Sequence, residues 1–197
     1  MTGERSPRSP LRDVLRDASR TAHSRLDATL GDHLLGADGY PDLLRLLQAF
    51  HATADPLLEQ WVRTSSTAPQ VVAPSRAGGF ASDLAVLGHS TGAPLSLAGL
   101  SRRPDGGVTD PAGLALLYVV AGSSIGARLI LRSLAGNIPH AARHGLADCA
   151  SAGSIELWRR TLVVLSVPVD PSVAAQAAAA CQLIFRQLLV RPRRRGE

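Results

Sequence analysis

The chain contains no lysine, so all 21 of its basic residues are arginines. An anion-binding site in this protein therefore has to use a guanidinium group, which holds a carboxylate through two parallel hydrogen bonds. Aromatic residues make up only 4% of the 197 residues, so leucine, valine and alanine have to fill most of the core. Two cysteines, Cys149 and Cys181, are too few for a disulfide framework and indicate a reducing compartment.

Targeting segments and long hydrophobic runs are also scarce. The first ten residues contain charges and prolines but no apolar run, so we expect no signal peptide. The apolar run 114–127 is too short to span a bilayer and is followed by Arg128. With 45% hydrophobic and 19% charged residues, the chain is predicted to be a soluble, cytoplasmic globular protein that does not bind membranes.

The formal net charge of +5 is concentrated near the end of the chain, where residues 191–195 contain four arginines. We predict a disordered leader over residues 1–9, one helical domain over residues 10–190 and a disordered basic tail over residues 191–197. A nucleic-acid-binding module built on this tail is the alternative. The sequence offers no aromatic platform or recognition motif for that role, so we expect no nucleic-acid partner.

Apolar residues recur at helical spacing along most of the chain, and no segment shows the alternation of a β-strand. We therefore predict an all-α, single-domain, multi-helical bundle of five to seven helices. Residues 65–79 and 91–110 are predicted to be mostly loop, and residues 136–154 irregular or a short helix. The main predicted helices cover residues 11–30, 41–63, 81–87, 112–134, 155–166 and 171–190.

One face of the first predicted helix carries a polar stripe. On a helical wheel Arg16, Arg20, His23 and Asp27 fall within roughly 60° of one another. Asp27 lies one turn beyond His23, within reach of its second ring nitrogen, and a metal-ligating histidine usually has such an acceptor. A boundary histidine in a salt-bridged helix has the same spacing, so the pattern leaves both interpretations open.

The helix predicted over residues 112–134 contains Gly122 and Gly126, one turn apart on the same face. Each glycine inside a helix lowers helix stability by about 1 kcal/mol relative to alanine. Two glycines in one helix therefore indicate that packing or binding requires them. Paired small residues allow either a flat ligand or a neighbouring helix to approach the backbone closely. The spacing does not choose between these two interpretations.

Two segments found in this order resemble the haem oxygenase family. Residues 15–27 (LRDASRTAHSRLD) resemble the opening helix of bacterial haem oxygenases, including those paired with bacteriophytochromes. Residues 117–128 (LYVVAGSSIGAR) resemble the distal helix of the same enzymes. Residues 40–51 and 80–88 resemble the second helix and a short D-L-x-x-L-G segment of the family. The resemblance covers nearly the whole chain and implies an all-α, haem-oxygenase-like fold.

The resemblance implies how haem would be held. His23 would be the proximal ligand of the haem iron, and Asp27 would orient its ring. Arg16 and Arg20 match basic positions that face the haem propionates in some members of the family.

The resemblance also implies the reaction. Haem would be both cofactor and substrate, and its cleavage with dioxygen would yield biliverdin, carbon monoxide and iron. Gly122, Ser123 and Gly126 would form the catalytic distal face, where the two glycines lie over the haem and Ser123 supports a water. No flavin or nucleotide fingerprint occurs, so electrons would come from a ferredoxin with its reductase. A bacteriophytochrome would be one user of the biliverdin.

Other functions remain open on the same fold. Ala121 and Ala127 replace an acidic residue and a glycine of the family pattern, which favours a non-catalytic haem carrier or sensor as the alternative. A di-iron oxidase needs several inward-facing carboxylates, but the chain has four glutamates and no Glu-x-x-His. A thiamin-degrading enzyme needs an activated cysteine, and both cysteines lie in segments that predict a structural role. His51 stands alone in its helix and is assigned no site.

Overall fold

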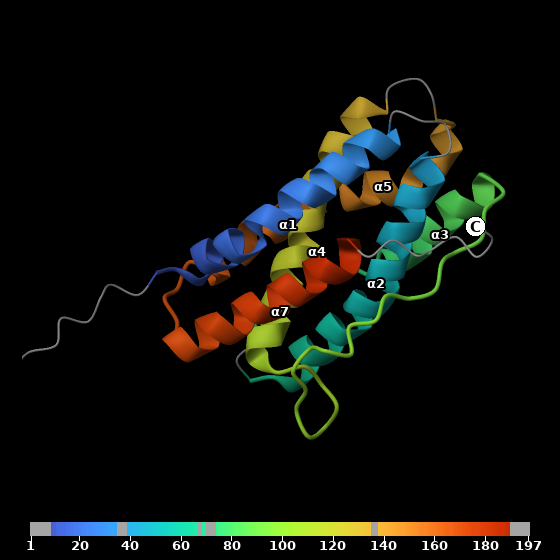
Figure 1. Cartoon of the computed structure of the whole chain (residues 1–197). Coiled ribbons are helices and arrows are strands. Elements are labelled where there is room, and N and C mark those ends of the chain that lie inside the picture. Colours follow the sequence, from blue (N-terminus) through green and yellow to red (C-terminus); the bar gives the residue numbers. More distant parts are fainter. Residues whose placement is uncertain (1–8, 35–38, 67, 70–73, 135–137, 190–197) are drawn as a thin grey trace, which may run out of the picture.

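In the computed structural model the chain is a bundle of α-helices (Figure 1). The structure describes residues 9–34, 39–66, 68–69, 74–134 and 138–189. Within these ranges there is no β-strand, which agrees with the predicted all-α class. The elements are α1 (Leu11–Leu34), α2 (Gly39–Thr64), α3 (Ala77–Val86), α4 (Asp110–Ser133), the 3-10 helix η1 (His140–Ala142), α5 (His144–Cys149), α6 (Ala152–Val164) and α7 (Pro171–Leu189). The predicted leader (apart from Ser9) and basic tail lie outside the described residues.

The helix bounds predicted from periodicity agree with the structure to within four residues, and the two bounds that differ by that much are the end of α1 and the start of α3. This helix begins at Ala77 rather than at residue 81, because Gly78 and Gly79 belong to the helix and not to the preceding loop. Gly79 lies against Gly145 of α5, where an added Cβ on Gly145 would be 2.4 Å from the carbonyl carbon of Gly79. These glycines allow two helices to touch through their backbones.

Helix α4 occupies the middle of the bundle. It packs against α7, α6, α5 and α2, while α1 runs alongside α7 (Figure 1). By length and composition α4 is apolar enough to cross a membrane, with a mean hydropathy of 1.9 over its most apolar window. Half of that window is buried inside the fold, as in the core helix of a globular bundle.

The core consists of two clusters, rich in leucine and alanine as the composition predicts. The larger cluster joins α1, α2, α4 and α7 with Leu97 and Leu100 from the loop before α4. The smaller one joins α2, α3, α5 and the end of α4 around Tyr40 and Phe80. The few aromatic side chains lie in or against these two clusters, where their large volume helps to fill the core.

Helices α2 and α4 are fastened together by Trp61. Its indole is fully buried, and Nε1 donates a hydrogen bond to Oδ1 of Asp110 at 2.9 Å. An added Cβ on Gly113 would lie 2.2 Å from the indole ring, so only glycine fits at this position. This contact fixes where α4 begins relative to α2. It therefore also fixes the positions of Gly122 and Gly126 along the bundle axis.

Candidate functional site

The structure brings His23 and Asp27 together on α1. Nδ1 of His23 lies 2.8 Å from Oδ2 of Asp27. Because a carboxylate can only accept, Nδ1 carries the proton and Nε2 of the neutral ring carries the lone pair. Within the described residues Nε2 makes no hydrogen bond, and the side chain of His23 is 58% exposed. The ring lies 5.6 Å from that of Phe185 on α7. His23 is thus an oriented imidazole with one open nitrogen.

Arg20 and Arg16 lie one and two turns before His23 and are held by acidic residues of the same helix. Nη2 of Arg16 is 3.1 Å from Oδ1 of Asp13, and Arg20 pairs with Asp17. The two arginine side chains are 65% and 70% exposed. Exposed pairs of this kind contribute about 0–1 kcal/mol, so either guanidinium can exchange its partner for another anion at little cost.

Gly122 and Gly126 on α4 face different surroundings. An added Cβ on Gly122 would lie 3.4 Å from the indole of Trp158, whereas one on Gly126 would meet nothing within 4 Å. Gly122 therefore lies beside Trp158 at ordinary contact distance, and Gly126 opens on free space. Beside Gly126, the apolar side chains of Ile125 and Leu129 are 39% and 59% exposed. This part of α4 presents an uncovered apolar surface, which suits an apolar ligand.

Directly after Gly122, Ser123 belongs to a buried polar network that the sequence did not reveal. Nη1 of Arg76 donates to the carbonyl of Val120 at 2.7 Å and to Oγ of Ser123 at 2.8 Å. The hydroxyl of Ser123 in turn donates to the same carbonyl. Arg76 is only 4% exposed, although it lies within residues 65–79, which were predicted to be mostly loop. No spacing pattern marks it, because its partners are 44 and 47 residues away.

The network continues to His51 and Asp55 on α2. Nδ1 of His51 lies 2.8 Å from Oδ1 of Asp55, whose Oδ2 accepts the backbone N–H of Arg76 at 2.8 Å. Burial lowers the pKa of His51, so the ring is neutral and its Nε2 is a buried acceptor without a partner. The His-x-x-x-Asp spacing, identical to that of His23 and Asp27, is the signal that would have found this pair.

Both cysteines are buried and form no disulfide. Sγ of Cys149 lies 3.6 Å from Oγ of Ser123, and burial raises the pKa of this thiol. Burial raises the pKa of Cys181 to about 12. Neither thiol has the lowered pKa of a nucleophile. In the part of the chain that the structure describes, no group of three or more histidine, cysteine or acidic side chains is arranged to hold a metal ion.

Comparison with known proteins identifies the fold. No protein-family model and no curated protein matches the sequence. Among solved structures, the chain is similar to the haem oxygenase of Neisseria meningitidis, a protein studied with NO and CO bound. The TM-score is 0.64 at 17% sequence identity, over 92% of this chain and 89% of that one. The chain therefore has the all-α fold of a haem oxygenase, and its activity has to be argued from its own residues.

Proposed function

We propose that this protein is a haem oxygenase, which cleaves haem to biliverdin, carbon monoxide and iron with dioxygen and external electrons. The observation that carries the proposal is the oriented, half-exposed imidazole of His23 with its open Nε2. A neutral histidine nitrogen of this kind is the usual axial ligand of haem iron in proteins that bind dioxygen. The haem-oxygenase-like fold supports the same interpretation.

The residues present fit haem. An iron ligand is available at Nε2 of His23, and α4 offers the exposed side chains of Ile125 and Leu129 to an apolar macrocycle. At Gly126 a ring system meets backbone rather than a side chain, because no Cβ is present and the space beyond is free. When bound, haem supplies both the iron that activates dioxygen and the porphyrin that is oxidised.

On the proximal side, Asp27 has an orienting role. Its carboxylate holds the Nδ1 proton of His23 and makes Nε2 a stronger donor toward a metal. Arg16 and Arg20 would exchange their exposed partners Asp13 and Asp17 for the carboxylates of the ligand.

On the distal side, the buried network holds polar groups beside the glycine segment. The hydroxyl proton of Ser123 is given to the carbonyl of Val120, and Arg76 donates to its oxygen. The thiol of Cys149, whose Sγ lies 3.6 Å from this oxygen, is the third partner that holds the hydroxyl in place. His51 adds a neutral ring whose buried Nε2 is a hydrogen-bond acceptor without a partner. The electrons would come from a separate donor, for which we infer a ferredoxin.

The test is an absorbance titration of the full chain with hemin, followed by addition of a reductant with catalase present. We expect a saturable shift of the Soret band on binding, and then its replacement by a biliverdin band. His23→Ala should abolish turnover, whereas His140→Ala, which removes an exposed histidine elsewhere, should retain it.

Two results would contradict the proposal in different ways. A Soret band that forms in a His23-dependent manner and persists under reductant would indicate a non-catalytic haem carrier or sensor. The absence of any saturable change would mean that the chain shares the fold without its ligand.

A further inference from the structure

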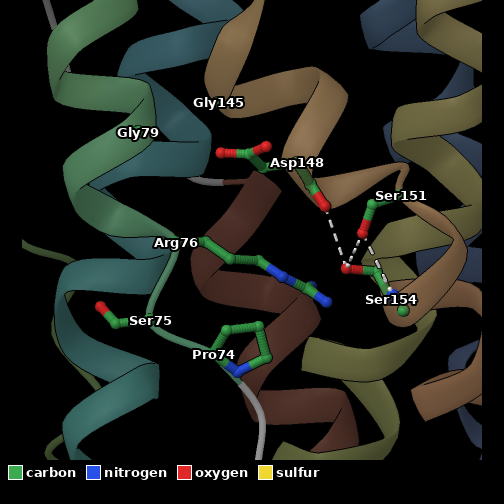
Figure 2. Close-up of a pocket in the computed structure, with 9 residues that line it drawn as sticks. Pro74, Ser75, Arg76, Gly79, Gly145, Asp148, Ser151 and Ser154 are labelled. Atoms are coloured by element: carbon green, nitrogen blue, oxygen red, sulfur yellow. Dashed lines mark hydrogen bonds between the residues drawn. The ribbon is translucent and has the colours of Figure 1, made fainter.

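A pocket of about 410 Å³ lies between α3, α5 and the beginning of α6. Its wall consists mainly of glycine and serine, together with one cation, Arg76, and one carboxylate, Asp148 (Figure 2). The volume is in the range of small-molecule sites and exceeds what a single inorganic ion needs. The glycines at positions 79, 145 and 153 leave this volume clear of side chains.

Arg76 brings an unpaired charge to this pocket. Only Nη1 is hydrogen-bonded, and both Nε and Nη2 are buried without a partner. Within the described residues no carboxylate forms an ion pair with this guanidinium, although buried charges are normally paired. Nε and Nη2 form one edge of the planar group, and their parallel N–H bonds match two oxygens of a carboxylate or a phosphate.

The surrounding backbone adds positive potential. Helix α3 begins directly after Arg76, and no side chain caps its first amides. Helix α6 begins beside the pocket at Ala152, where Ser151 accepts one amide, that of Ser154. Helix N-termini carry partial positive charge and favour anions. The carboxylate of Asp148 points toward Gly79 and Gly145, away from the guanidinium (Figure 2).

We propose that this pocket binds a small molecule through a phosphate or carboxylate group held by the Nε–Nη2 edge of Arg76. The hydroxyls of Ser151 and Ser154 lie at the end of the pocket toward which the Arg76 side chain extends (Figure 2). The first donates to the second and the second to the carbonyl of Asp148, so the guanidinium is the main donor to a ligand. Since Arg76 also holds Val120 and Ser123 of α4, an occupied pocket would steady the segment beside Gly122. The inference does not depend on haem.

The test measures thermal unfolding of the full chain, without added haem, during parallel titrations with inorganic phosphate and with sodium acetate. Sodium chloride at equal ionic strength is the reference. We expect at least one of the two oxyanions to raise Tm in a saturable way, since a ligand that binds only the folded state stabilises it. The more effective one shows which group the pocket selects.

Three variants make the result specific. Gly153→Asp adds a carboxylate at the pocket wall, where the space is open, and should raise the apparent Kd by about tenfold or more. Gln176→Asp adds the same charge on the exposed face of α7 and should leave the Kd within about twofold of the original. Arg76→Gln should abolish the response, but it also removes the bonds to Val120 and Ser123 and can unfold the chain.

The proposal is overturned if neither oxyanion gives a saturable rise beyond that of chloride. It is equally overturned if Gly153→Asp, still folded by circular dichroism, responds as the unmodified chain does. Because no step of this experiment uses haem, its failure is distinguishable from a failure of the proposed haem oxygenase activity.

Discussion

Replacing Asp55 by alanine should be among the most damaging single changes in this protein. The carboxylate accepts a hydrogen bond from Nδ1 of His51 and another from the backbone of Arg76, each at 2.8 Å, and is 6% exposed. Its removal leaves two buried donors without a partner, and each such donor costs about 1–3 kcal/mol. We expect a loss of about 3–5 kcal/mol in the free energy of unfolding.

The measurement is urea denaturation at pH 7.5, followed by far-UV circular dichroism. Glu59→Ala is the matched control, because Glu59 lies one turn after Asp55 on α2, is 69% exposed and pairs with Arg63 at 3.9 Å. It should change the free energy by less than about 0.5 kcal/mol. Asp55→Asn retains one acceptor oxygen and should fall between the two. Equal midpoints for Asp55→Ala and Glu59→Ala would refute the claim that the buried network stabilises the fold.

Three further predictions follow from the same contacts. Gly145→Ala should destabilise by about 1–3 kcal/mol in urea melts, because its Cβ would meet the backbone of α3, whereas Gly78→Ala has free space and should stabilise by up to about 1 kcal/mol. Because burial lowers the pKa of His51, the unfolded chain binds a proton that the native chain does not, so stability should fall as pH drops below the ordinary value of 6.5. That slope should be absent in His51→Gln. If Asp27 orients His23 as proposed, Asp27→Ala should weaken hemin binding by about 10–100-fold, and because this carboxylate is exposed the change should leave Tm unaltered.

The elements that periodicity predicted well are those whose helices bury a continuous apolar face. α2 and α7 agree with their predicted bounds within two residues, because their apolar residues recur at the spacing of one buried face. The beginning of α3 was missed because Gly78 and Gly79 have low intrinsic helix propensity, and contact with α5 overrides it. The pairing of His23 with Asp27 was predictable, because both partners lie within one turn.

Arg76 could not be predicted for a different reason. Its role comes from contacts with α2 and α4, at sequence separations of 21 residues to Asp55 and 47 residues to Ser123. An arginine in a proline-containing polar stretch is usually exposed, and its burial follows from where α3 docks against α2 and α5 rather than from neighbouring residues. Long-range burial of this kind has no signature in local spacing.

The chain contains two His-x-x-x-Asp pairs with the same sequence spacing. The two pairs differ in burial, and this difference separates what each histidine can do. Both place Nδ1 at 2.8 Å from a carboxylate one turn later. The His23 side chain is 58% exposed and its Nε2 is open, so it can take a ligand from outside the protein. The His51 side chain is 0% exposed, and it contacts the rings of Phe50 and Phe80, so no external ligand reaches it. The same spacing therefore gives an exposed imidazole with an open nitrogen on α1 and an internal polar group on α2, because Phe80 of α3 covers the second pair.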